Sequence, residues 1–167
     1  MSAADNDDEI RKWHRWFGAE CNNRAWRLSE APARSAAEDD EMLDAAHAAA
    51  LHWSTVGTAI HRARADMLLA HVHALLRHGT IAMQYAQRSF DAVMSRESPD
   101  WELAFAHAVL AHAALAANDT RLHAHHYMRA KEIGFALPDA EERQIFEATF
   151  TRIPPPPVAD ATVTSGR

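Results

Sequence analysis

The sequence has little cysteine, glycine or proline, and it has no long run of hydrophobic residues. Its single cysteine, Cys21, excludes an internal disulfide and a cysteine-rich zinc site, which agrees with a reducing compartment. It has only 5 glycines and 7 prolines in 167 residues, and four of the prolines follow one another at 154–157. No stretch of about 18 apolar residues occurs, and no apolar segment follows a basic N-terminus. We therefore expect a cytoplasmic protein with no membrane span and no secretory signal.

The charge and the missing motifs argue against several functional classes. A formal net charge of −6 with neutral histidines argues against a general nucleic-acid surface. The chain has no glycine-rich phosphate loop and no GxSxG nucleophile motif. Asp44 and His47, with Glu41 one turn earlier, form half of a di-iron bundle site, but no second carboxylate-x-x-His pair accompanies them. A solvated helix face is the alternative, and we expect no enzyme activity, no cofactor and no metal site.

The chain does have the composition and periodicity of α-helices. Its 36 alanines favour helix, and nothing alternates with the period of two that a strand requires. Capping and turn residues divide the chain, and they predict helices at about residues 7–29, 35–55, 58–77, 80–95, 99–118, 119–133 and 138–153. Gly134 is expected to end the sixth helix. The predicted fold class is all-α, with one domain over 1–153 and a proline-rich, disordered tail over 154–167.

An internal repeat relates the middle of the chain to the part that follows it. A shift of 41 residues superposes two predicted helical hairpins, with Ala70 on Ala111, Ala74 on Leu115 and Ser89 on Ala130. Pairs of helices with small residues where they cross are typical of the tetratricopeptide repeat, whose period is about 34 residues. The extra residues match the connector at 95–101. Arg77 and Asn118 occupy equivalent positions where a turn glycine is usual, and both Ala70 and Ala111 are expected at close helix crossings.

A longer pattern extends over about residues 22–153. It is carried by Asn23, Ala25 and Trp26, by 38–43 with Ala45, Ala46 and His47, by His52, Trp53, Val56, Gly57 and Thr58, by Arg62 or Arg64, and by 100–127 and 142–153. This pattern resembles that of an uncharacterised bacterial family of tetratricopeptide-like proteins. The resemblance implies a right-handed array of about three helical hairpins with a C-terminal capping helix. It implies a fold and no particular reaction.

Such an array predicts a function in binding. The first helices of its pairs form a concave surface that usually takes an extended peptide or a partner helix. We therefore expect a non-enzymatic interaction module that binds a peptide, a helix or its own copy. The alternative is a small-ligand or metal-responsive sensor that uses a groove lined by histidine and arginine. Its candidate ligand-binding residues are His52, Trp53, His61, Arg64, His71 and His112.

Each group of these candidates also has a structural interpretation. Around residues 52–64, Trp53 would pack, Gly57 would reverse the chain and Thr58 would cap the third helix, whose free N-terminus would otherwise suit an anion. His71 and His112 are equivalent under the shift of 41, so they either line one groove or lie buried as hydrogen-bonded rings. Both interpretations remain open from the sequence.

Aromatic and histidine residues give two further predictions. Trp13, Trp16 and Phe17 make the first helix aromatic, so they either dock onto the second helix or form the interface of a homodimer. The chain also has 12 histidines, of which His47, His71, His107 and His112 are candidates for burial. A histidine buried as a neutral ring makes the fold less stable in acid.

Overall fold

The structure, a computed structural model, describes residues 3–157 and is all-α. Within this part of the chain 81 % of the residues are helical and none lies in a strand. The helices are α1 (Ala3–Glu30), α2 (Ala36–Val56), α3 (Ala59–Leu75), α4 (Gly79–Met94), α5 (Asp100–Ala116), α6 (Thr120–Phe135) and α7 (Ala140–Phe150). The predicted fold class is therefore confirmed at the level of its helices. The predicted tail lies mostly outside the described residues, and residues 154–157 carry no helix.

The ends of the helices follow the capping residues. Ser35 accepts a hydrogen bond from the backbone N–H of Glu38, and the Glu38 carboxylate accepts one from the backbone N–H of Ser35 at 2.8 Å. This capping box satisfies two N–H groups that the first turn of α2 would otherwise leave unpaired. The last helix begins later than predicted. Its cap is Asp139, which accepts from two backbone N–H groups, and not the preceding Pro138.

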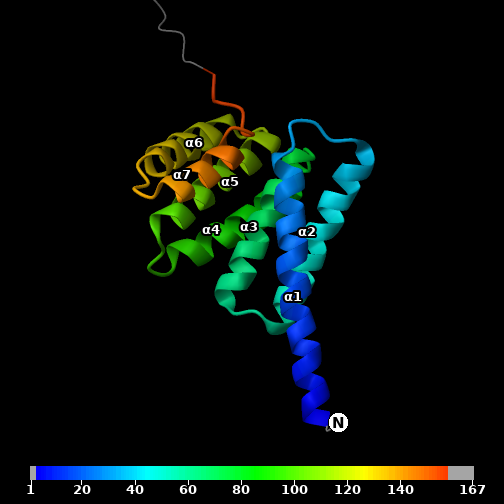
Figure 1. Cartoon of the computed structure of the whole chain (residues 1–167). Coiled ribbons are helices and arrows are strands. Elements are labelled where there is room, and N and C mark those ends of the chain that lie inside the picture. Colours follow the sequence, from blue (N-terminus) through cyan, green and yellow to red (C-terminus); the bar gives the residue numbers. More distant parts are fainter. Residues whose placement is uncertain (1–2, 158–167) are drawn as a thin grey trace, which may run out of the picture.

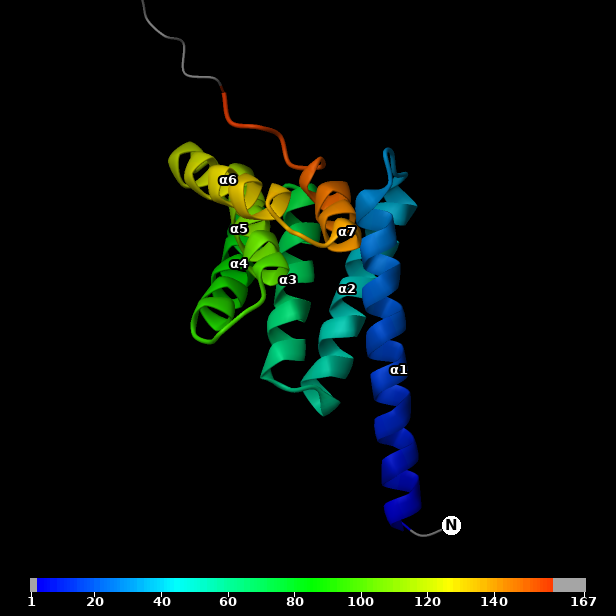
Figure 2. The ribbon, with the colours of Figure 1, turned by 60° about the vertical axis from the view of Figure 1, so that its left-hand side comes forward.

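Consecutive helices pack as neighbours, so that α1 with α2, α3 with α4 and α5 with α6 form three pairs (Figure 1). The final helix, α7, packs against α5 and α6 and also reaches α1. In Figure 2, α7 lies beside the C-terminal end of α1, and the N-terminal end of α1 extends beyond the other helices. Among residues 3–157, no helix has both the length and the apolar character needed to cross a bilayer.

The second and third pairs have the same boundaries once the shift of 41 is applied. Ala59–Leu75 becomes Asp100–Ala116, and Gly79–Met94 becomes Thr120–Phe135. The turns agree as well, because Arg77 and Asn118 have φ values of 60° and 64° in the left-handed region that favours glycine. Ala70 and Ala111 are both fully buried. The shift found in the sequence therefore corresponds to equal helix lengths and equal turn geometry.

Gly134 does not end α6 as predicted. It lies inside the helix, and the next residue continues the helical turn. A Cβ atom at this position would collide with the ring of Phe146 from α7, which is fully buried. Because a core ring has no room to move, the glycine is required for close approach rather than for a turn. The residue equivalent to Gly134 in the preceding pair is Val93, so this contact is specific to the docking of α7.

Candidate functional site

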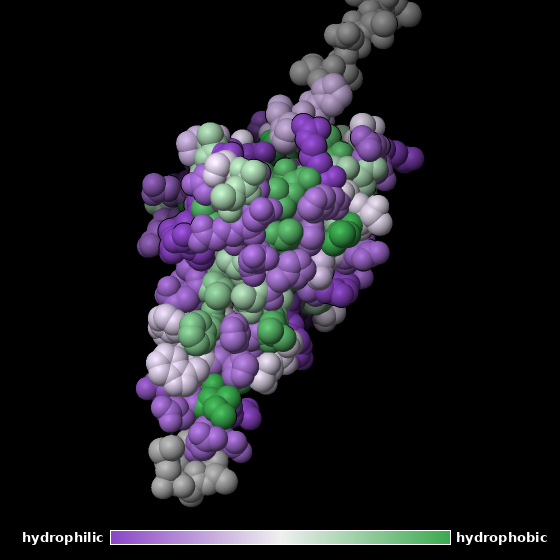
Figure 3. Space-filling view, turned by 90° about the vertical axis from the view of Figure 1, so that its right-hand side faces the viewer, coloured by the Kyte–Doolittle hydropathy of each residue, from purple (hydrophilic) through white to green (hydrophobic). Residues whose placement is uncertain are grey.

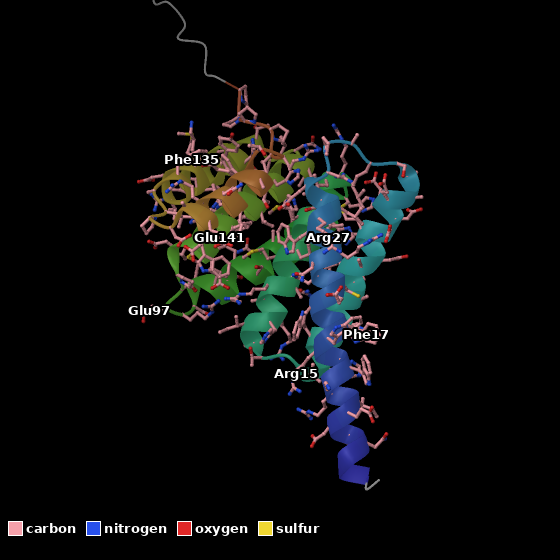
Figure 4. The ribbon with its side chains drawn as sticks, in the orientation of Figure 1. Arg15, Phe17, Arg27, Glu97, Phe135 and Glu141 are labelled. Carbon is pink, nitrogen blue, oxygen red and sulfur yellow. The ribbon has the colours of Figure 1, made fainter. Side chains whose placement is uncertain are left out.

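A pocket of about 470 Å³ opens among α1, α3, α5 and α7. Three of these are the first helices of the three pairs, and the fourth is the helix that follows the last pair. In Figure 4, Arg27 and Glu141 mark α1 and α7. The volume lies in the range of pockets that bind small molecules or side chains. Helices from all three pairs and the final helix therefore meet at this pocket.

The walls of the pocket are mainly apolar and aromatic. Trp26 comes from α1, Met67 from α3, Trp101 and Phe105 from α5, and Ile145 from α7. The Phe105 ring contacts both tryptophans edge to face, at 5.9 Å from Trp26 and 6.3 Å from Trp101 between ring centroids. Such contacts fix the orientation of the rings. The pocket thus presents aromatic surface that is held in place by the core behind it.

One rim of the pocket carries an ion network centred on Glu102. This carboxylate is fully buried, and its two oxygens bind Arg64 at 2.8 Å and Arg96 at 2.6 Å. A buried charge is costly unless it is paired, and two arginines with good geometry provide that pairing. The Arg64 guanidinium also lies over the Trp101 ring, 4.9 Å from its centroid. Arg64 therefore lines the pocket while it shares the single negative charge of Glu102 with Arg96.

The opposite rim carries carboxylates that have no cation beside them. Glu30 from α1 and Glu142 from α7 both line the pocket, and neither forms an ion pair within the described part of the chain. Thr149 donates a hydrogen bond to Glu30 at 3.3 Å. Burial raises the pKa of Glu30, while this hydrogen bond lowers it. The pocket therefore combines aromatic walls with two unneutralised carboxylates.

His71 and His112 lie behind the pocket wall and do not line the pocket. The His71 ring stacks on Trp26 with centroids 5.3 Å apart, and its Nδ1 lies 3.4 Å from Nδ1 of His112. Both rings are buried, at 0 % and 5 % exposure. Burial holds the pKa of His71 well below its usual value and lowers that of His112 to about 4. Of the two sequence interpretations, the structure agrees with buried neutral rings.

His52, Trp53 and His61 lie at a different place, around the turn between α2 and α3. The Trp53 ring stacks on His61 with centroids 4.5 Å apart, and a Cβ on Gly18 of α1 would come within 2.9 Å of this ring. His52 pairs with His14 of α1 at 2.9 Å between their Nδ1 atoms. The structure thus joins these three residues to α1 and separates them from the pocket that holds Arg64. Their contacts are those of a packed hinge.

Several other histidines also form pairs. Nδ1 atoms lie 2.8 Å apart in His107 and His126 and 3.1 Å apart in His73 and His78. His47, predicted as a candidate for burial, is exposed, whereas His73 and His126 are buried. No group of three or more His, Cys, Asp or Glu side chains placed to hold a metal ion occurs in the part of the chain that the structure describes.

The sequence did not identify most residues of the pocket as a site. Glu102, Glu30 and Glu142 were not candidates, and only Arg64 was. One signal was present, because Glu102 stands alone as a charge among the alanines and leucines that follow it in α5. A second was the shift of 41, which places Arg64 on Phe105, and both residues line the pocket. The pairing of Arg64 with Glu102 depends on the approach of α3 to α5.

The aromatic residues at the start of α1 remain exposed. Trp13 is 52 % and Trp16 is 51 % exposed, and they contact each other and Phe17. Phe17 stacks on His52 of α2 with ring centroids 5.5 Å apart, so this ring docks onto α2 as one of the two predicted arrangements has it. The two tryptophans keep about half of their surface exposed, and the homodimer interface stays a prediction. In Figure 3 hydrophobic residues appear among hydrophilic ones along the projecting part of the molecule.

The Glu102 network gives a stability prediction. We expect Glu102→Gln to lower the free energy of unfolding by about 2 kcal/mol, because it leaves two arginines without their counter-charge. The matched control is Glu132→Gln, which breaks the exposed pair of Glu132 with Arg129 and should cost less than about 1 kcal/mol. Urea unfolding of both variants measures the difference. Equal losses would mean that burial of Glu102 adds nothing to its ion pairs.

Comparisons with known proteins identify no family for this chain. We therefore interpret the pocket, the histidine pairs and the equal helical pairs from the residues of this chain alone. The resemblance to a bacterial tetratricopeptide-like family stays a prediction. The chain matches no protein-family model, no curated protein and no solved structure.

Proposed function

We propose that this chain is a non-enzymatic interaction module of tetratricopeptide-like type, which binds a peptide segment of a partner protein in the pocket among α1, α3, α5 and α7. The observation that carries the proposal is that the first helix of every pair contributes to one pocket. In arrays of helical pairs this face takes extended peptides or helices. The identical boundaries of α3 with α4 and α5 with α6 under the shift of 41 support the array itself.

The role of α7 supports a binding site for a short segment rather than for a long one. In an open array the groove would continue along the first helices. Here α7 contacts α1 as well as α5 and α6, so it closes one side of the groove. Ile145, Glu142 and Thr149 bring α7 side chains into the pocket. We infer that the pocket accepts one or two side chains of the partner, with the peptide backbone running across the opening.

Ile145→Ser tests this function, with Ile81→Ser as its matched control. Both isoleucines are exposed, at 53 % and 43 %, but only Ile145 lines the pocket. Peptides selected from a displayed random seven-residue library on the unchanged protein are expected to bind Ile145→Ser at least about tenfold more weakly, because the apolar contact with the bound peptide is lost without any change of charge. Binding to Ile81→Ser should not change.

If both variants retain binding, or if both lose it equally, the selected peptides do not occupy the pocket. The melting temperatures of the two variants identify any loss that comes from unfolding. Because both positions are on the surface, neither substitution is expected to change stability by more than about 0.5 kcal/mol.

The second candidate function is a small-ligand sensor, and the aromatic lining of the pocket is the observation that favours it. Arg64 lines this pocket as that hypothesis requires, but His52, Trp53 and His61 lie elsewhere, and His71 and His112 lie behind Trp26. The sensor would therefore use Arg64, Glu30 and Glu142 in place of histidines. A small molecule that binds the pocket when no displayed peptide does so would favour this candidate.

We also propose that the chain associates with its own copy through the exposed stripe of Ile10, Trp13, Trp16 and Phe17. These side chains are 42–52 % exposed and lie in the N-terminal part of α1, where Phe17 also stacks on His52 of α2. An apolar stripe of this kind is typical of an interface, since aromatic residues are favoured there. Arg15 and Phe17 lie on opposite sides of α1 (Figure 4), so the charged side of the helix stays in water.

Light scattering over a concentration series tests self-association. The unchanged protein is expected to approach twice the monomer mass as the concentration rises, and Trp13→Glu with Trp16→Glu should keep it monomeric. Since both tryptophans are half exposed, the double variant should fold with little change in stability. A monomer mass for the unchanged protein at every concentration contradicts the proposal.

A further inference from the structure

The charged side chains that line the pocket are one arginine and two glutamates, and this excess of negative charge favours one class of ligand. Arg64 is the cation on the pocket lining, and Glu102 pairs with it at 2.8 Å. The second oxygen of Glu102 binds Arg96, so both oxygens of the buried carboxylate already hold cations of the chain itself. Glu30 and Glu142, in contrast, form no ion pair in residues 6–157. The two side chains of the lining that carry a charge without an ion pair are therefore both carboxylates, one from α1 and one from α7.

The partial burial of Glu30 strengthens this argument. Desolvation raises the pKa of its carboxyl group, and the hydroxyl of Thr149 supplies only one neutral hydrogen bond. An ionised carboxylate in such a place is stabilised most by a cation that enters with few waters of its own. The neighbouring ring of Trp26 also favours a cation, because the faces of an indole ring are negative; the Trp101 ring already has Arg64 over one face.

From this geometry we propose that the pocket takes the basic side chain, lysine or arginine, of the partner's peptide segment. The apolar stem of that side chain packs against Trp26, Met67 and Ile145, and its cationic head is held by Glu30 and Glu142. Long basic side chains combine these two properties, an apolar stem and a charged end. This inference rests on the proposed function and names the chemistry that the pocket recognises.

An anionic occupant is the main rival, and Arg64 is the residue that would bind it. A carboxylate entering the pocket would compete with Glu102 for Arg64, and it would also meet the two carboxylates of Glu30 and Glu142, which form no ion pair of their own. Like charges in a partly buried site oppose binding. The balance of charge therefore favours a cation.

Two probes test the inference directly. The first is a displayed random seven-residue library, in which the peptides selected on the unchanged protein are expected to share one lysine or arginine next to apolar residues. The second is a matched series of hexylammonium, hexanol and hexanoate, followed by NMR of the indole N–H signals, with Trp26→Phe and Trp101→Phe used for assignment. We expect hexylammonium to bind about tenfold more tightly than hexanol, and hexanoate to bind most weakly.

The variants Glu30→Gln and Glu142→Gln remove one charge each and keep the shape of the side chain. Each is expected to weaken hexylammonium and basic peptides about tenfold, and to leave hexanol unchanged. Glu141→Gln is the matched control, because Glu141 is exposed, lies next to Glu142 in the same turn of α7 and does not line the pocket (Figure 4). Glutamine at position 30 still accepts the hydrogen bond from Thr149, so the fold should be retained.

The outcomes separate this inference from the function on which it rests. Pocket-dependent peptides without a shared basic residue, or with a shared acidic one, overturn the inference and leave the interaction module in place. If no displayed peptide depends on the pocket but hexylammonium binds there, the peptide function fails and the pocket is one for a small amine. Binding that survives both glutamine variants overturns the roles of Glu30 and Glu142.

Discussion

Between pH 7.5 and pH 5.5 the melting temperature is expected to fall by about 6–12 °C. The cause is a group of histidines that the fold keeps neutral. Burial lowers the pKa of His73, His107 and His112 to about 4, and it lowers those of His71 and His126 as well. In the unfolded chain these groups return to a pKa near 6.5. The unfolded state therefore binds more protons than the folded state over this range of pH.

The sign of the effect follows from proton linkage. Because the pKa values are lower in the folded state, stability is fully present well above pH 6.5 and decreases as the pH falls toward 4. At pH 5.5 each histidine with a folded pKa of about 4 costs roughly 1 kcal/mol, or about 3 kcal/mol for three. For a domain of this size each kcal/mol corresponds to about 2–4 °C. Glu30 acts in the opposite sense, because its pKa is raised.

The geometry of the pairs adds to the effect of burial. In each pair, such as His107 with His126, one ring donates through Nδ1 and the other accepts. Protonation of the acceptor removes the hydrogen bond and places a positive charge beside its neighbour.

Calorimetry in buffers of equal ionic strength measures this pH dependence. His61→Gln is the control, because His61 is not among the charges that act on these five rings, and it should leave the slope of melting temperature against pH unchanged. His107→Gln should reduce that slope, even if it also lowers stability at pH 7.5. A melting temperature that stays constant from pH 7.5 to 5.5 contradicts the account of buried neutral rings.

Gly134→Ala is expected to lower the free energy of unfolding by about 3 kcal/mol and to loosen α7. The new Cβ would occupy space that the Phe146 ring fills, and that ring is fully buried in the core. Overpacking of a core forces the backbone to move. Since α7 carries Glu142 and Ile145, its displacement opens the pocket. Hydrogen exchange is expected to rise in α7 and remain unchanged in α3.

Gly18→Ala is the matched control for this prediction. Gly18 is also a helical glycine whose Cβ would contact an aromatic ring, at 2.9 Å from Trp53. Trp53 is only partly buried, so it can move, and the better helix propensity of alanine offsets the contact. In a Phe146→Leu background, Gly134→Ala should cost less than about 1 kcal/mol. A full loss in that background would mean that Phe146 is not the cause.

The helices could be predicted from the sequence because their signals are local. Caps such as Ser35 with Glu38, and turn residues such as Arg77 and Asn118, act within a few residues of the chain. Gly134 shows the limit of this reasoning. A glycine near the end of a helix suggests a stop, but its reason here is Phe146, which is 12 residues away in α7. Contacts of this kind depend on how helices approach one another.

The pocket was harder to predict for the same reason. Arg64 and Glu102 are 38 residues apart and meet only when α3 packs beside α5. Glu30 and Thr149 are 119 residues apart and come together through α7. The 12 histidines of the sequence suggested a binding role for His52, His61, His71 and His112. In the structure these four rings contact other side chains of the chain and do not line the pocket. Charges that stand alone in apolar helices are the more useful signal.

The most direct measurement of the central claim is photo-crosslinking from inside the pocket in cells of the source organism. A p-benzoylphenylalanine at position 145 is expected to link the chain to a discrete partner protein, through a peptide that contains a lysine or arginine. The same group at position 81, which is also exposed but lies outside the pocket, should not form this product. Identical products from both positions, or none from position 145, would contradict the account.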